Sequence, residues 1–204
     1  MLHYERKLRM IKNNIKGTLE VICGSMFSGK SEELIRRIKR AEFAKQSIIT
    51  FKHHFDDRSS LESVVSHNGN AVKAIPIKHP HEILTYVDTT HEVIGIDEIQ
   101  FFPLFIANVI GELIEQGKRI IVAGLDLDFR GIPFGCMPIL MAVADNVTKL
   151  KAICMDCGKD AHYTQRLVNG NAAKFDDPII LIGAEESYQA RCRDCHIIDK
   201  TIEF

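Results

Sequence analysis

The sequence predicts an α/β fold with a mostly parallel sheet, followed by a small second unit. Three observations lead to this prediction. Between Thr18 and Leu150, short apolar runs alternate with longer amphipathic runs, the pattern of strand–helix–strand units around a parallel sheet. After Lys151, the composition shifts to Cys, Gly, Asp and Asn with few apolar stretches. A length of 204 residues allows one domain with an appendage, or two small domains.

The expected elements of the main domain follow from these patterns in order. The first strand is expected at residues 19–23. A helix is expected from Ser31, because apolar residues recur on one face at helical spacing, namely Leu34, Ile35, Ile38 and Ala41. Further strands are expected at 47–51, 92–96 and 119–123, and a second helix runs from Phe105 until just before Gly117. The sheet therefore has at least four expected strands.

The predicted organisation is a basic, flexible tail at residues 1–17, a main domain at 18–150 and a small domain at 151–204. The 26 basic and 27 acidic side chains give a net charge of −1, which provides no global field for nucleic acid or an anionic membrane. We therefore expect neither as a partner. The longest purely apolar run, residues 139–144, is far shorter than the ~20 residues that span a bilayer.

The chain holds six cysteines, and no apolar region of a secretory signal follows its basic first residues. Cysteines in such a chain favour metal binding or free thiols over disulfides, because the cytosol is reducing. A cytoplasmic location is the expectation.

Residues 24–31 match the phosphate-loop pattern G-x-x-x-x-G-K-[ST] at every fixed position, between an expected strand and an expected helix. In order they are Gly24, Ser25, Met26, Phe27, Ser28, Gly29, Lys30 and Ser31. Backbone N–H groups of such a loop and the helix N-terminus cradle phosphate oxygens. Lys30 is expected on the β- and γ-phosphates of ATP, and Ser31 is expected to bind Mg²⁺. The alternative is a chance glycine-rich turn.

An acidic pair, Asp97 and Glu98, directly follows the apolar run at 93–96. Enzymes with a phosphate loop need a carboxylate near the metal, usually at the end of a strand adjacent to the loop. We therefore expect Asp97 to orient Mg²⁺, and Glu98 to take a proton from an attacking hydroxyl. The alternative is a solvated acidic turn. Spacing alone leaves open whether water or a substrate alcohol is the group that attacks.

Two Cys-x-x-Cys pairs, Cys154 with Cys157 and Cys192 with Cys195, predict one structural zinc ion held by four thiolates. The 34 residues between the pairs exceed the usual spacing, so a long excursion must leave the metal and return. A redox dithiol is the alternative. Cys23 and Cys136 lie apart from this set and are interpreted as small buried residues.

These residues together resemble type II thymidine kinases from Thr18 to Cys195. Besides the phosphate loop and the cysteine pairs, the likeness includes segments 56–59 (DDRS), 66–69 (SHNG), 97–102 (DEIQFF), 124–126 (GLD), 129–130 (FR), 133–135 (PFG) and 163–167 (YTQRL). Residues 124–131 are similar to the bacterial branch of that family. The resemblance implies a zinc-held lasso at 151–204.

The resemblance also implies an activity, which is transfer of the γ-phosphoryl group of ATP to the 5′-hydroxyl of thymidine, giving dTMP in nucleotide salvage for DNA synthesis. Glu98 matches the general base, and Arg58 matches an arginine at the transferring phosphoryl group, although a surface arginine is the simpler interpretation of Arg58 alone. A homotetramer and feedback inhibition by dTTP are further implications.

A thymidine pocket is implied as well. Its expected residues are Met26, Phe101, Leu125, Phe129, Phe134, Thr164, Ile179, Leu181, Gly183 and Tyr188. For the aromatic members, ordinary core packing is the alternative.

Two other classes of protein share parts of this pattern. A nucleic-acid-dependent ATPase with a zinc ribbon would have the phosphate loop and the cysteines, but the near-neutral charge disfavours it. A regulatory nucleotide-binding module would keep Lys30 and Ser31 without a proton acceptor, which Glu98 disfavours.

Overall fold

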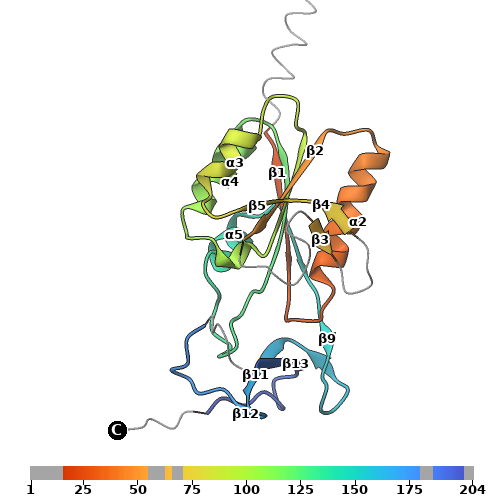
Figure 1. The fold of residues 1–204 in the computed structure, drawn as a ribbon. Coiled ribbons are helices and arrows are strands. Elements are labelled where there is room, and N and C mark those ends of the chain that lie inside the picture. Colours follow the sequence, from red (N-terminus) through yellow and green to blue (C-terminus); the bar gives the residue numbers. More distant parts are fainter. Residues whose placement is uncertain (1–15, 55–62, 66–70, 180–185, 200–204) are drawn as a thin grey trace, which may run out of the picture.

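The computed structural model describes residues 16–54, 63–65, 71–179 and 186–199. Its centre is a six-stranded parallel sheet in the order β5-β2-β6-β7-β1-β8 (Figure 1). The strands are β1 (Thr18–Cys23), β2 (Ile48–His53), β5 (Ile75–Ile77), β6 (Val93–Asp97), β7 (Arg119–Gly124) and β8 (Asn146–Lys149). The predicted α/β class with a mostly parallel sheet is confirmed.

Helices cover both faces of this sheet (Figure 1). Helix α2 (Lys30–Phe43) lies on one face, and α3 (His81–Tyr86), α4 (Ile106–Glu115) and α5 (Met137–Val143) lie on the other. Successive side chains of a strand point to opposite faces. On β1, Ile22 therefore packs with α2, whereas Val21 and Cys23 pack on the side of α4 and α5. All five residues of β6 are buried, as expected for a strand covered on both faces.

The sequence after β8 forms small antiparallel sheets beyond the carboxyl ends of the parallel strands (Figure 1). Strands β9 (Ala152–Ile153) and β10 (Asp160–Ala161) pair with each other, and β11 (Tyr163–Val168) pairs with β12 (Asn171–Ala172) and β13 (Glu186–Arg191). A further antiparallel pair, β3 (Ser63–Val65) and β4 (Ala71–Lys73), contributes Val64 and Val72 to the core under α2.

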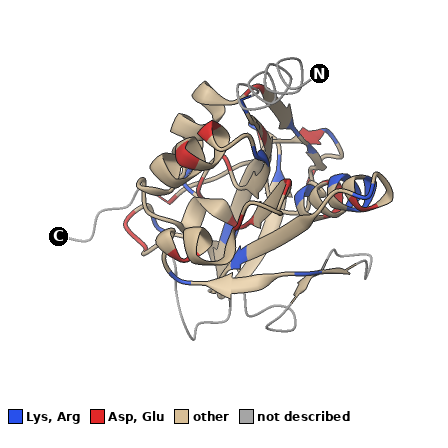
Figure 2. Ribbon diagram, turned by 90° about the horizontal axis from the view of Figure 1, so that it is seen from above, with Lys and Arg blue, Asp and Glu red and all other residues tan. Residues whose placement is uncertain are grey.

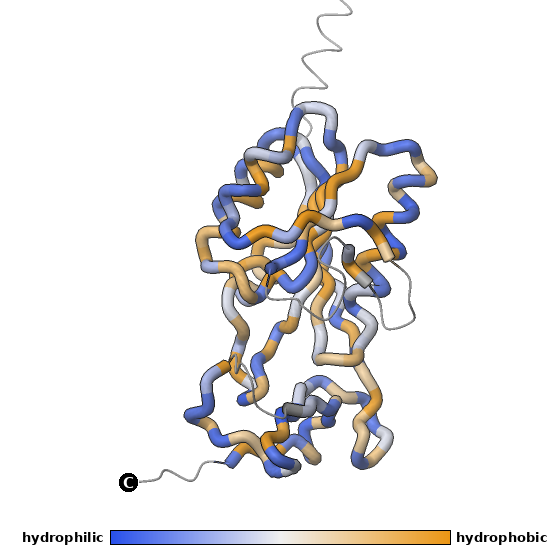
Figure 3. The backbone as a smooth tube through the Cα atoms, viewed as in Figure 1, coloured by the Kyte–Doolittle hydropathy of each residue, from blue (hydrophilic) through white to orange (hydrophobic). Residues whose placement is uncertain are grey.

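The surface and the core differ as expected for this architecture. Hydrophobic residues concentrate in the central strands and become sparser in the part formed by β9–β13 (Figure 3). Acidic and basic residues are interspersed over the ribbon, in keeping with the net charge of −1 (Figure 2). Within the described part of the chain, no helix is both long and apolar enough to cross a bilayer.

All four expected strands and both expected helices are present. The elements that the sequence pattern missed include the two edge strands. Strand β5 has the sequence Ile-Pro-Ile, and β8 is largely exposed. Edge strands are covered on fewer sides and tolerate proline and polar residues, so they carry a weak pattern. The basic tail falls outside the described residues, except for Lys16 and Gly17.

Candidate functional site

The phosphate loop joins β1 to α2 in a tight conformation. Gly24 has a φ of +146°, and a Cβ there would lie 2.4 Å from the carbonyl oxygen of Leu150, so a side chain does not fit. The Ser28 hydroxyl donates to the carbonyl oxygen of Ser25 (2.8 Å), and Lys30 Nζ donates to the same oxygen (2.8 Å). The ammonium group is therefore held against the loop, and the N-terminus of α2 opens beside it.

The loop is connected to the acidic pair through Ser31. Its hydroxyl donates to Asp97 Oδ2 over 2.9 Å. Strand β7 lies between β1 and β6, so the acidic strand is not the direct neighbour of the loop strand. The contact still forms, since all the carboxyl ends meet at one edge of a parallel sheet. Hydroxyl and carboxylate oxygens are suitable Mg²⁺ ligands, so Ser31 and Asp97 fit the predicted ion.

Asp97 sits in an environment that disfavours its charge. It is 4% exposed, and burial, followed by the neighbouring charge of Glu98, raises the pKa of Asp97 from 3.8 to about 7. A divalent cation at the carboxylate would favour the ionised form. The backbone N–H of Glu98 also donates to Asp97 Oδ1 (3.0 Å), which fixes the carboxylate plane.

Glu98 occupies an unusual backbone position directly after β6. Its φ of +52° and ψ of +39° are left-handed, which is uncommon for a residue other than glycine. A 3₁₀ turn, η1 (Ile99–Phe101), follows, and from this turn Gln100 Nε2 donates to Glu98 Oε2 over 2.6 Å. Such local strain is typical of functional sites. The sequence motif included Gln100 but assigned it no role.

The antiparallel part of the chain, which consists of strands β9–β13, contacts the phosphate loop directly. The backbone N–H of Met26 donates to Thr164 Oγ1 (3.0 Å), and the Ser25 hydroxyl lies 3.5 Å from the carbonyl oxygen of Ala161. Two residues of the expected thymidine pocket, Met26 and Thr164, are thus brought together. Phe101 and Phe134 form a second such pair, with ring centroids 5.6 Å apart in a T-shaped contact.

Three other residues of the expected pocket, Phe129, Ile179 and Tyr188, have surroundings different from those of these two pairs. Phe129 is buried beneath two guanidinium groups, those of Arg166 at 5.1 Å and Arg130 at 5.7 Å from the ring centroid. Arg166 is fully buried and donates to the carbonyl oxygen of Pro178, a role that the sequence did not indicate. Tyr188 pairs with Arg166 across β13 and β11, and Ile179 is 38% exposed. Arg58, Leu181 and Gly183 lie outside the described residues.

His53, at the end of β2, packs against the aromatic rings that follow Glu98. The His53 ring is buried and packs 5.7 Å from Phe101 and 4.6 Å from Phe102, measured between ring centroids. Burial, with a smaller contribution from His54, lowers the pKa of His53 from 6.5 to about 4. Below pH 6.5 the unfolded chain therefore takes up a proton that the folded chain does not. The free energy of unfolding consequently decreases as the pH is lowered.

We expect the free energy of unfolding to fall by roughly 2 kcal/mol more between pH 7 and pH 5 in the parent protein than in His53→Phe. Urea denaturation at both pH values measures this difference. The control is His79→Gln, a variant at an exposed site. Its free energy of unfolding should have the same pH dependence as that of the parent. If His53→Phe also matched the parent, the assignment of the effect to His53 would be wrong.

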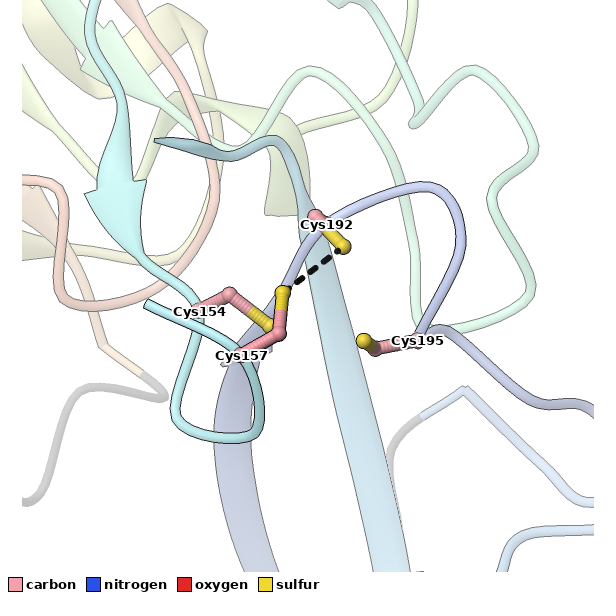
Figure 4. Close-up of side chains that lie close together, drawn as sticks. All are labelled: Cys154, Cys157, Cys192 and Cys195. Carbon is pink, nitrogen blue, oxygen red and sulfur yellow. Dashed lines mark hydrogen bonds between the residues drawn. The ribbon is translucent and has the colours of Figure 1, made fainter. Parts of the chain in front are cut away.

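The four paired cysteines form one cluster, although they come from both ends of the antiparallel part (Figure 4). Their Sγ atoms all lie within 4.8 Å of one another, and Cys157 and Cys192 are separated by 3.6 Å. A tetrahedral Zn²⁺ with Zn–S bonds of about 2.3 Å requires sulfur separations of about 3.8 Å, so the cluster fits the ion. Cys154 and Cys157 follow β9, and Cys192 and Cys195 follow β13.

The other two cysteines behave as the sequence predicted. Cys23 and Cys136 are fully buried in the main core. Burial raises the pKa of the Cys23 thiol to about 11 and that of the Cys136 thiol to about 12, so both stay protonated at neutral pH.

A family model described as thymidine kinase matches residues 17–196. The chain belongs to the thymidine kinase family. The matched region includes the phosphate loop, the acidic pair and all four clustered cysteines, so the family predicted from the motifs is confirmed. Membership in the thymidine kinase family makes the protein a kinase and implies a nucleotide and thymidine as its substrates. The four close cysteines are compatible with structural zinc.

Proposed function

We propose that the protein transfers the γ-phosphoryl group of ATP to the 5′-hydroxyl of thymidine, giving dTMP for DNA synthesis. The observation that carries the proposal is the 2.9 Å hydrogen bond between Ser31 and Asp97. It places the phosphate loop against the acidic pair, so a donor phosphate held by the loop would lie near a carboxylate that can accept a proton. Phosphoryl transfer depends mainly on such positioning and on charge neutralisation.

The residues of the loop have separate roles in this proposal. The backbone N–H groups of residues 24–31 bind the phosphate oxygens, and Lys30 adds a positive charge beside them. Ser31 and Asp97 would hold the Mg²⁺ that accompanies ATP, which neutralises charge on the β- and γ-phosphate oxygens when bound. Arg58, outside the described residues, is proposed to stabilise the transferring group.

Glu98 is the proposed general base. It lies at the same edge of the sheet as the phosphate loop and is half-buried. A carboxylate at this position can accept the 5′-hydroxyl proton as the new P–O bond forms. The oxygen of thymidine attacks the γ-phosphorus, and ADP leaves with the electron pair of the broken bond.

The acceptor pocket is proposed at the junction of the phosphate loop with the antiparallel part. The hydrogen bond from Met26 to Thr164 supports this location, because it joins the loop to β11. Met26, Leu125 and Thr164 would border the 5-methyl group of thymine. A single methyl group contributes only about 1 to 3 kcal/mol to discrimination. Deoxyuridine is therefore expected as a weaker substrate, and deoxycytidine is expected to be rejected.

A product assay tests both the reaction and its acceptor. Zinc-loaded protein is incubated with Mg·ATP and with each of thymidine, deoxyuridine, deoxycytidine, deoxyadenosine and deoxyguanosine, and the products are separated. We expect thymidine 5′-monophosphate with one ADP per product, and kcat/KM for deoxyuridine about 10- to 100-fold lower. Lys30→Ala is the inactive control. Unmodified labelled thymidine with the parent protein would refute the proposal.

Other features are proposed on the family resemblance and on cysteine chemistry. The cytoplasm is the proposed compartment, because the metal-binding form of cysteine is the reduced thiolate. A homotetramer and inhibition by dTTP are proposed as well, and neither nucleic acid nor a membrane is proposed as a partner. Sedimentation tests the homotetramer, and a dTTP titration of the kinase assay tests the inhibition.

A further inference from the structure

Gln100 forms a two-ended bridge inside the candidate site. Its side-chain Nε2 donates to Glu98 Oε2 over 2.6 Å, and its Oε1 accepts a hydrogen bond from the backbone N–H of Leu125 over 3.0 Å. Gln100 is 2% exposed, so its amide is shielded from water. The bridge joins the end of β6 to the end of β7.

The chemistry of the two ends fixes the orientation of the amide. A backbone N–H can only donate, so the atom of Gln100 that faces Leu125 must be the oxygen. The NH₂ group must then face Glu98. The opposite orientation would set the amide oxygen against the carboxylate and a donor against the N–H of Leu125. Gln100 is therefore a dedicated donor to Glu98.

Two glycines approach Gln100 closely. A Cβ on Gly124 would lie 2.6 Å from Gln100 Oε1, and a Cβ on Gly135 would lie 2.3 Å from the backbone carbonyl oxygen of Gln100. Both neighbouring segments approach this closely because glycine has no side chain. Gln100 is thus closely enclosed by the end of β7 and by the segment that contains Gly135.

We infer that Gln100 is the positioning residue for the general base, holding the Glu98 carboxylate at a set distance from the segment that begins with Leu125. The inference rests on the proposed function and specifies how its base is oriented. Because Leu125 is also a proposed pocket residue, the same amide connects the proton acceptor to the acceptor nucleoside. A misplacement of about 1 Å at a reacting group lowers rates on the order of 10²-fold.

The test compares steady-state kinetics of the parent, Gln100→Met, Glu98→Gln and the double variant. Methionine has a similar length but no donor. We expect Gln100→Met to lower kcat about 10- to 100-fold, with KM for Mg·ATP within twofold of the parent. In the double variant, kcat should stay within threefold of Glu98→Gln alone, because Gln100 acts only through Glu98. Gln116→Met, an exposed site after α4, should leave kcat unchanged.

The outcomes separate the two claims. A parent protein that leaves thymidine unmodified overturns the proposed function and the inference with it. An active parent, combined with near-parental kcat in Gln100→Met or with independent, multiplying losses in the double variant, overturns the inference alone. If Gln100→Met does not fold, Gln100→Leu replaces it. Leucine has no donor for Glu98 in any protonation state, so parental kcat in that variant would equally contradict the inference.

Discussion

Replacement of Glu98 by glutamine is expected to lower kcat for thymidine phosphorylation about 10²- to 10⁴-fold, the usual contribution of a general base. Glutamine preserves the size of the side chain, and its amide oxygen can still accept the hydrogen bond from Gln100. It cannot take up the 5′-hydroxyl proton. The contacts within the phosphate loop involve Ser25, Ser28 and Lys30, so ATP binding should persist.

Three measurements check this expectation. Rapid-quench or steady-state assays give kcat, equilibrium binding of a fluorescent ATP analogue gives donor affinity, and thermal unfolding reports the fold. The matched control is Glu42→Gln, an exposed glutamate near the end of α2. Turnover near the parental value in Glu98→Gln, with the control also active, would show that another group accepts the proton.

Removal of one thiolate in Cys154→Ser should cause loss of zinc and a loosened antiparallel part. Two cysteines and three alanines make up the small buried core of that region, namely Ala152, Cys154, Ala161, Ala190 and Cys192, and the partly buried Cys195 packs against it. With so little apolar area, a bound zinc ion would provide much of the folding free energy of this region. We expect zinc content to fall from one to below about 0.2 per chain and KM for thymidine to rise at least about tenfold.

Zinc content is measured by atomic emission on dialysed protein, and KM by the product assay at saturating ATP. Cys136→Ser is the matched control, because the Cys136 thiol contacts the carbonyl oxygen of Ile99, far from the cluster in the fold, and serine can keep that contact. The control should retain full zinc. Full zinc in Cys154→Ser would remove Cys154 from the ligand set.

Local chemistry explains which parts of the site could be predicted from the sequence. A phosphate loop has a fixed spacing of glycines, lysine and serine, so residues 24–31 are sufficient to identify it. The two thiol pairs also predict a shared zinc site, although 34 residues separate them, because zinc needs four ligands and the chain offers two pairs. The buried face of α2 followed from helical periodicity in the same way.

Long-range geometry explains what could not be predicted. Strand order is a property of pairing between distant segments, so the position of β7 between the acidic strand and the loop strand has no local signal. The role of Gln100 depends on the N–H of Leu125, which only the pairing of β6 with β7 brings near. Arg166 resembles an exposed residue by type, and only the fold shows it packed over Phe129.

The direction of β1 has a practical consequence for handling the protein. The strand enters the sheet at Thr18 and reaches the phosphate loop after Cys23, a path of roughly 20 Å at about 3.3 Å per residue. The described part of the chain thus begins at the opposite end of the sheet from the phosphate loop (Figure 1). A fluorophore or surface linker attached at the exposed Lys16 would leave the proposed catalytic edge accessible to nucleotides, so protein immobilised there should be suitable for kinetic work.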